Sequence, residues 1–274
     1  MKNQKIGLIG AGQMGKPMAI NLKKAGYDVY VFDTNKKTIQ EMAEHNISTA
    51  ASSKEVALKV DETIIIMVRD GKQVNSVIFG EEGIVSTNRQ GLNIIVCSSI
   101  SPADARKLGK DVSDVNLKLL NAPVSGAEKG AQAGALTLMV SGDEDSYNKC
   151  KPVFEAIGKE IFYFGTKQES AQGAKLANNL ILGVNIYACV EGFKFAESMG
   201  IDEGVFERLL SVTTGNSWVS QNWAWTKTLF EQKYNQESLL ALLYKDLQGV
   251  LNEGNVSLPL TGLTAQLVLS KKEY

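Results

Sequence analysis

Gly10, Gly12 and Gly15 follow one another in G-x-G-x-x-G spacing, a pattern that can hold a pyrophosphate. The first glycine allows a tight turn, the second lets the backbone approach the phosphates, and the third lets a helix pack closely on the preceding strand. Gln13 and Met14 begin that helix, whose N-terminal N–H groups bind anions. The spacing predicts a dinucleotide site at these five residues, and a purely structural turn is the alternative.

Asp33 supplies a carboxylate about 20 residues beyond the glycines, where an acid binds the ribose hydroxyls of adenosine. It follows Asp28–Phe32, which is predicted to be a second strand. Because a carboxylate repels a 2′-phosphate, Asp33 favours NAD over NADP. Residues 34–37, Thr-Asn-Lys-Lys, leave NADP open, since they offer groups that can meet a 2′-phosphate.

Lys175 and Asn179 are four residues apart in a long helical pattern and therefore share one face of the helix. Lys175 lies near the N-terminal end, where the helix dipole and partial burial would lower the pKa of a lysine towards neutral pH. A general acid or base needs such a pKa. The alternative is a solvated surface charge, the common role of a lysine in a helix.

Ser125, Gly126 and Ala127 follow a further apolar run, residues 117–124. A hydroxyl beside exposed backbone N–H groups can grip a carboxylate. For these residues taken alone, a tight loop that binds no ligand is an equally good interpretation.

A sheet is needed to position these groups, and apolar runs of strand length alternate with helical patterns as in a doubly wound fold. The clearest predicted strands are residues 6–9, 28–32, 63–68 and 92–97. Ligands of such sheets lie beyond the carboxyl ends of the strands, so Met67, Val68 and Ser99 are expected to line the cofactor. Helix capping by Ser98 or Ser101 is an alternative that requires no ligand.

The pattern of apolar residues in the sequence changes near Gly165. After this residue no strand-like run occurs, and a helical pattern covers residues 173–196. We therefore predict an α/β Rossmann-type domain over residues 1–164 and an all-helical domain over residues 165–274.

Composition argues against several classes of partner. The 274 residues include 29 basic and 30 acidic side chains, and no basic patch suggests nucleic acid or an anionic membrane. The first strand follows Met1 without room for a signal peptide, and no apolar run reaches spanning length. A cytoplasmic location is expected.

Histidine and cysteine usage argues against a metal site. His45 is the single histidine of the chain, so it cannot form a histidine metal cluster, and a Ser-His-Asp triad would have to use it. The three cysteines, Cys97, Cys150 and Cys189, are too scattered for a zinc site or a disulfide framework. A general acid or base is therefore expected to be a residue other than histidine.

Five motifs together make the chain resemble the β-hydroxyacid dehydrogenase family over nearly its whole length. They are the stretches 7–15, 98–102, 122–126, 173–179 and 245–247. The resemblance implies a helical second domain, dimers or tetramers, and interconversion of a small hydroxy acid and its semialdehyde. It also implies catalysis by Lys175 with support from Asn179.

The resemblance assigns the remaining residues as well. It implies that Ser125 and Gly126, with the adjacent Ala127, bind the substrate, and that Ser99 and Lys245 contact the nicotinamide end of NAD or NADP. Two departures from the family pattern are Asn121, where an aspartate is common, and Ala127, where a glycine is common. They keep two rivals open, an imine reductase of related fold and a non-catalytic NAD-binding module.

Overall fold

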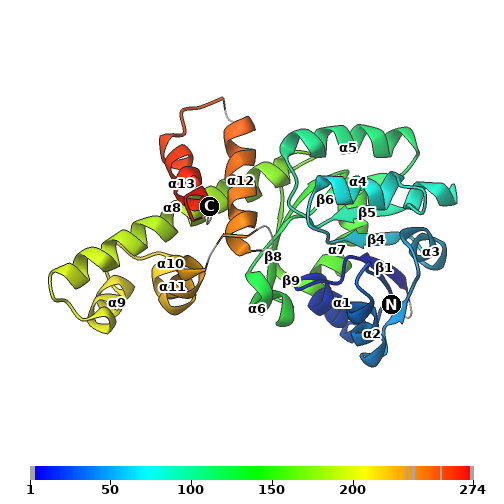
Figure 1. The fold of residues 1–274 in the computed structure, drawn as a ribbon. Coiled ribbons are helices and arrows are strands. Elements are labelled where there is room, and N and C mark those ends of the chain that lie inside the picture. The colour runs from blue at the N-terminus through cyan, green and yellow to red at the C-terminus, as the bar shows by residue number, and fades with distance from the viewer. Residues whose placement is uncertain (1–3, 233, 236–237, 254, 272–274) are drawn as a thin grey trace. The chain divides into compact units, whose positions relative to one another are not determined.

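The computed structural model describes residues 4–232, 234–235, 238–253 and 255–271. It divides into two compact units, Met1–Lys175 (unit 1) and Leu176–Tyr274 (unit 2). Figure 1 labels the helices and strands of both.

Unit 1 is built on a nine-stranded sheet in the order β3-β2-β1-β4-β5-β6-β8-β7, with β9 paired to β8. The strands from β1 to β6 are parallel, whereas β8 is antiparallel to both β6 and β7. The bounds are β1 Lys5–Ile9, β2 Asp28–Phe32, β3 Ser48–Thr49, β4 Thr63–Ile66, β5 Asn93–Val96, β6 Lys118–Asn121, β7 Val124–Ser125, β8 Leu136–Gly142 and β9 Gly158–Tyr163. This topology confirms the predicted Rossmann-type sheet.

Helices cover both faces of this sheet (Figure 1). On β4, Ile65 belongs to one core cluster with Met18 of α1 and Phe154 of α7, whereas Ile64 and Ile66 belong to the opposite cluster with α3, α4 and α5. Burial on two faces explains why β4 reads as an uninterrupted apolar run. The helices are α1 Gly15–Lys24, α2 Lys36–Glu44, α3 Ser53–Lys59, α4 Gly71–Phe79, α5 Pro102–Asp114, α6 Ala127–Gln132 and α7 Glu144–Ile157, with a 3₁₀ turn, η1, at Ile84–Thr87.

The strand order reverses at β1, which lies between β2 and β4. The Gly10 N–H donates to the Phe32 carbonyl at 2.9 Å, and the Met67 N–H donates to the Ile9 carbonyl at 2.8 Å. These bonds draw together the carboxyl ends of the three strands. Ligands of open α/β sheets bind at such a switch point.

Unit 2 is helical in all its described elements. They are most of α8 Ser170–Ser198, then α9 Glu203–Ser211, α10 Trp218–Gln221, α11 Trp223–Glu231, α12 Leu239–Glu253 and α13 Pro259–Leu269. Its main core includes Ile186 of α8, Leu240 and Leu247 of α12 and Val268 of α13. The predicted helical second domain is thus confirmed.

The two compact units divide within α8, after Lys175, while the domain boundary near Gly165 stays a prediction. The first turns of α8 belong to unit 1 because they are bonded to it. The Gln172 side chain donates to the Ser98 carbonyl at 3.0 Å, and the Ala171 N–H donates to the Ser141 hydroxyl at 3.2 Å.

Helix α8 is long and apolar enough to cross a membrane by length and composition, which corrects the expectation that no apolar run reaches spanning length. Its most apolar window has a mean hydropathy of 1.2 and is 28% buried. The helix also carries Lys175, Glu191 and Lys194. Ile186 and Val190 place part of its apolar surface in the cores of unit 2.

Candidate cofactor and catalytic site

The three glycines of the phosphate-binding turn have different physical roles. Gly10 has a φ of +91°, and a Cβ there would clash with the Met67 carbonyl. A Cβ on Gly15 would clash with the Gly10 carbonyl. Gly12, by contrast, faces open space, with no atom within 4 Å of a Cβ placed on it. Gly10 and Gly15 therefore shape the turn, and Gly12 leaves its outer face clear for a ligand.

The N-terminus of α1 is suited to an anion. Met14 occupies the N-cap position and provides no side-chain cap, and the first turn contains no acidic residue. Lys23 and Lys24 complement the dipole at the other end of the helix. The neighbouring Gln13 amide donates to Glu128 Oε2 at 2.8 Å, which connects this turn to α6.

Asp33 is held at the end of β2 by two backbone donors. The Ala11 N–H donates to Asp33 Oδ2 at 2.7 Å, and the Asn35 N–H donates to Oδ1 at 2.8 Å. Each carboxylate oxygen keeps lone pairs for a further donor such as a ribose hydroxyl. The carboxylate is therefore fixed directly beside the phosphate-binding turn.

A cavity of about 570 Å³ in unit 1 brings together five predicted cofactor residues, Gly10, Gly12, Asp33, Met67 and Val68. Other parts of its wall were not predicted, and they come from residues 51–53, from α4 and from residues 80–82. These segments follow β3 and β4 or the helix after β4. The rule that ligands lie at the carboxyl edge of the sheet could have identified those that follow the strands.

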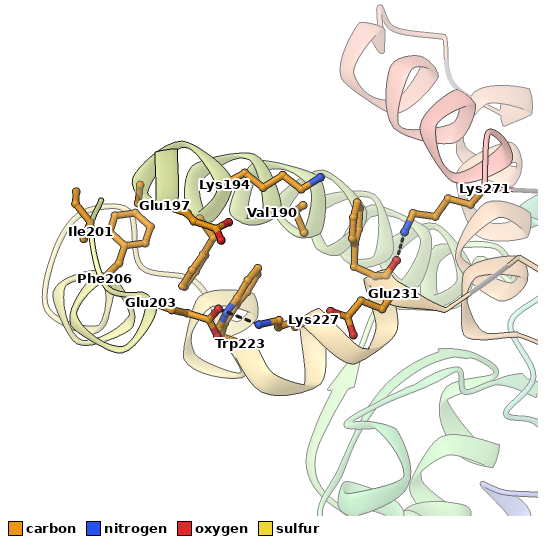
Figure 2. Close-up of a pocket in the computed structure, with 13 residues that line it drawn as sticks. Val190, Lys194, Glu197, Ile201, Glu203, Phe206, Trp223, Lys227, Glu231 and Lys271 are labelled. Atoms are coloured by element: carbon orange, nitrogen blue, oxygen red, sulfur yellow. Dashed lines mark hydrogen bonds and ion pairs between the residues drawn. The ribbon is translucent and has the colours of Figure 1, made fainter. Parts of the chain in front are cut away.

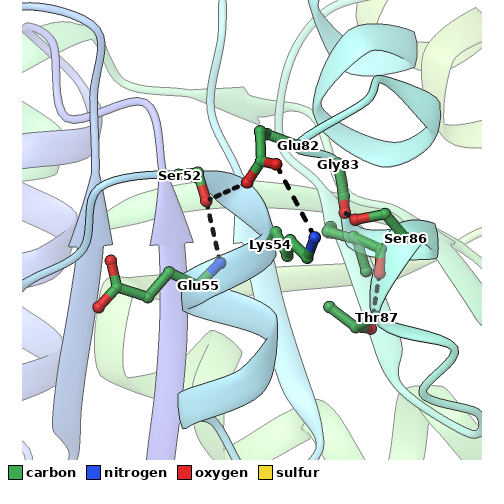
Figure 3. Close-up of polar contacts among 8 residues, drawn as sticks. Ser52, Lys54, Glu55, Glu82, Gly83, Ser86 and Thr87 are labelled. Atoms are coloured by element: carbon green, nitrogen blue, oxygen red, sulfur yellow. Dashed lines mark hydrogen bonds and ion pairs between the residues drawn. The ribbon is translucent and has the colours of Figure 1, made fainter.

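Polar contacts fix the rim of this cavity (Figure 3). The Ser52 hydroxyl lies 3.3 Å from Glu82 Oε2 and accepts a bond from the Glu55 N–H at 3.2 Å. Lys54 Nζ lies 3.8 Å from Glu82 Oε1. The rim thus carries a carboxylate whose charge is partly balanced by a lysine.

The loop after β5 has both capping and connecting roles. The Ser101 hydroxyl caps α5 by accepting from the Asp104 N–H at 3.0 Å. The buried Ser98 hydroxyl accepts from the Val68 N–H at 2.9 Å, which ties this loop to the loop after β4. Ser99, half-buried between them, lies in this loop but is not among the residues that line the cavity.

The predicted substrate loop has an unusual backbone. Ser125 ends β7, opposite Thr137 of β8. The next two residues have positive φ, +123° at Gly126 and +51° at Ala127. A left-handed conformation is costly for a residue with a Cβ, so Ala127 occupies a position that favours glycine.

The predicted catalytic residues fall in both units. Lys175 is buried at the end of unit 1, with 9% of its surface exposed. In unit 2, the Asn179 amide donates to Asp246 Oδ2 at 2.5 Å, and Lys245 Nζ lies 3.5 Å from Asp246 Oδ1. Asp246 is 5% exposed and holds both partners.

Cysteine chemistry has little support in this chain. Burial raises the pKa of the Cys97 thiol to about 12, and burial is also the main cause that raises the pKa of Cys150 to about 11. Both therefore remain protonated at neutral pH. Within the described residues, no group of three or more His, Cys, Asp or Glu side chains is arranged to hold a metal ion.

A second cavity, of about 630 Å³, lies within unit 2 (Figure 2). Its walls combine aromatic rings, including the stacked pair Phe193 and Trp223, with charged side chains. Among these, Lys227 Nζ forms an ion pair with Glu203 Oε2 at 2.9 Å. None of the predicted site residues lines it.

Comparison with known proteins relates both parts of the chain to nicotinamide-dependent enzymes. Residues 5–165 match the family described as the NAD binding domain of 6-phosphogluconate dehydrogenase. Residues 170–273 match the family described as NAD-binding of NADP-dependent 3-hydroxyisobutyrate dehydrogenase.

Two curated relatives align over most of the chain. The 2-hydroxy-3-oxopropionate reductase of Escherichia coli (strain K12) is 36% identical over 96% of this chain and 89% of its own length. The 2-(hydroxymethyl)glutarate dehydrogenase of Eubacterium barkeri is 32% identical over 97% of this chain and 88% of its own length.

Solved structures agree with these alignments. The 3-hydroxyisobutyrate dehydrogenase of Salmonella typhimurium superposes with a TM-score of 0.86 at 28% identity, covering 98% of this chain and 94% of that one. An imine reductase from Pseudomonas sp. gives 0.70 at 18% identity, covering 98% and 93%, a likeness that shows the fold alone.

Proposed function

Because the chain belongs to the β-hydroxyacid dehydrogenase family, we propose that it interconverts a small 3-hydroxy acid and its semialdehyde, with Lys175 as general acid and base. It is an NAD(P)-dependent oxidoreductase that acts on a small molecule. The observation that carries the proposal is the buried position of Lys175 on the helix that leaves the cofactor-binding unit. An amine withdrawn from water is suited to exchange a proton with a bound substrate.

The residues of unit 1 fit a dinucleotide. Gly12 leaves the outer face of the turn open, the start of α1 lacks a side-chain cap, and Asp33 has oxygens available to ribose hydroxyls. These three features would hold the pyrophosphate and the adenosine ribose. The nicotinamide, when bound, accepts or supplies the hydride.

The proton and the substrate are assigned to side chains of the chain itself. Lys175 takes the hydroxyl proton during oxidation and returns it to the oxygen during reduction. Ser125 and Gly126 bind the substrate carboxylate through a hydroxyl and backbone N–H groups. Asn179, whose amide is fixed by Asp246, supports Lys175 from the next turn of α8.

We also propose that NAD is preferred over NADP. Asp33, Glu81 and Glu82 line the cavity, whereas Arg69 is the cationic residue in its wall. The excess of carboxylates disfavours a 2′-phosphate, which carries further negative charge.

A homo-oligomer in the cytoplasm completes the proposal. Large apolar side chains are exposed on α8 and α9, including Phe195 at 68% and Leu209 at 51%. Exposed apolar side chains favour association. Light scattering in solution and cell fractionation test these two points.

The first experiment measures NADH and NADPH oxidation with glyoxylate, succinic semialdehyde, methylmalonate semialdehyde, tartronate semialdehyde and a cyclic imine. Turnover of an aldehyde acid supports the proposal, and Lys175→Met is expected to lower kcat by roughly 100-fold or more while NADH still binds. Wild-type turnover by Lys175→Met would defeat the assignment of Lys175.

The same panel separates the rivals. Reduction of the cyclic imine alone would favour an imine reductase, to which the structural likeness gives fold-level support. Cofactor binding without turnover on any compound would favour a non-catalytic module.

A further inference from the structure

A chain of three side-chain amides runs through unit 1 and connects segments that carry proposed site residues. It consists of Asn121, Gln168 and Gln172, named here the amide network. Asn121 and Gln172 have no exposed surface, and Gln168 is half-buried. Buried amides need hydrogen-bond partners, so their arrangement is demanding.

Gln172 satisfies all of its polar groups within this network. Its Nε2 donates to the Ser98 carbonyl at 3.0 Å and to Asn121 Oδ1 at 3.3 Å. Its Oε1 accepts from the Ile100 N–H at 3.1 Å. With two donated bonds and one accepted bond, only one orientation of the amide fits.

In the other two amides, as in Gln172, the NH₂ group donates to the next acceptor along the network. Asn121 Nδ2 donates to Gln168 Oε1 at 2.9 Å, and Gln168 Nε2 donates to the Leu119 carbonyl at 3.2 Å. The Ser141 hydroxyl donates to the Gln168 carbonyl at 2.9 Å. The segment that enters α8 is therefore bonded through both its backbone and its side chain.

The connected segments are those that the proposed reaction uses. Ser98 and Ile100 flank Ser99. Asn121 ends β6, a few residues before Ser125. Gln172 lies one helical turn before Lys175 on α8.

We infer that Gln172 is a positioning residue, which sets the place of Lys175 relative to the loops of Ser99 and Ser125 through the amide network. This inference rests on the proposed function. Apolar packing is non-directional. The three hydrogen bonds of the Gln172 side chain are directional, so they fix both the rotation of the start of α8 about its axis and its position along that axis. A displacement of about 1 Å at a reacting group can lower a rate by about 100-fold.

The test compares Gln172→Met with Ser146→Ala at a temperature where circular dichroism shows both to be folded. Ser146 is also buried in unit 1 and donates to Asp143 Oδ1 at 2.8 Å, but it lies outside the network. Gln172→Met should lower kcat by roughly 10-fold or more while the Kd for NADH changes by less than about threefold. Ser146→Ala should leave kcat within about twofold of wild type.

A second readout is independent of turnover. Competitive acetylation followed by mass spectrometry measures the reactivity of individual lysines against pH. Gln172→Met should change the pH profile of Lys175 and leave the exposed Lys149 unchanged, and Ser146→Ala should alter neither. If Gln172→Met does not fold, Gln168→Leu removes the outer end of the network and should shift both readouts in the same direction by a smaller factor.

Unchanged kcat or unchanged Lys175 labelling in a folded network variant overturns the inference. Equal loss of activity in Ser146→Ala also overturns it, because the effect would then be general destabilisation. A wild-type protein without turnover on any substrate defeats the proposed function instead. Labelling of Lys175 then decides the positioning role by itself.

Discussion

Asp33 illustrates how one residue can set cofactor choice through charge as well as hydrogen bonding. Its carboxylate accepts from Ala11 and Asn35 and lines the cavity that Gly12 opens. In Asp33→Asn an amide oxygen can retain one of the backbone bonds, but the negative charge is lost. We expect the ratio of the Kd for NADPH to the Kd for NADH to fall by roughly 10- to 100-fold, about 1.4 to 2.8 kcal/mol. Titration calorimetry with both cofactors measures this ratio.

Glu82→Gln provides the matched control at the rim of the same cavity. Because Lys54 lies near Glu82 and partly balances its charge, the ratio should change much less there. An unchanged ratio in Asp33→Asn would mean that neutral features of the cavity set the preference. Equal changes in both variants would instead indicate a general effect of negative charge.

At the scale of elements, the sequence predicted best where a local pattern determines the structure. The apolar run at Ile64–Ile66, the turn of the three glycines and helix capping by Ser101 all have the predicted form. The position of β8 between β6 and β7, and the contact of Ser52 with Glu82, depend on pairing between distant segments. No local pattern specifies such pairs. The amide network was missed for the same reason, since Gln172 and Ser98 are far apart in the chain.

Helix α7 provides a pH test of an element. Asp143 caps it by accepting from the backbone N–H and the hydroxyl of Ser146, and these bonds lower the pKa of the Asp143 carboxyl. Its stabilising contribution is therefore complete above the unfolded pKa and lost as pH falls through the folded pKa. An asparagine at this position would cap the helix without titrating.

We expect Asp143→Asn to lower the free energy of unfolding by about 0.5 kcal/mol at pH 7. The difference in this free energy between variant and wild type should shrink below about pH 4. Urea denaturation at several pH values measures it. The control is Asp114→Asn. Asp114 is the last residue of α5, so its charge lies at the C-terminal end of a helix, and the substitution should not lower the free energy of unfolding. A difference that stays constant from pH 7 to pH 3 would contradict the role of the charged cap.

At the scale of the whole molecule, α8 belongs to both units. Its first turns are bonded to unit 1 through Gln172, while Ile186 and Tyr187 help to form the core of unit 2. The predicted boundary near Gly165 came from composition, which records the loss of strand-like runs. Unfolding of unit 1 would remove the partners that satisfy the start of α8, so the two units should unfold cooperatively.

Cofactor binding tests this coupling. NADH at 100 times its Kd stabilises the folded state by about 2.7 kcal/mol, which corresponds to a rise in Tm of roughly 5–10 °C for a chain of this size. We expect one calorimetric transition that moves as a whole, because α8 transmits the gain in unit 1 to unit 2. Two transitions, of which NADH moves only one, would contradict cooperative unfolding. Gln172→Met weakens the attachment of α8 and should therefore broaden or divide the transition, whereas Ser146→Ala should lower Tm and leave its shape unchanged.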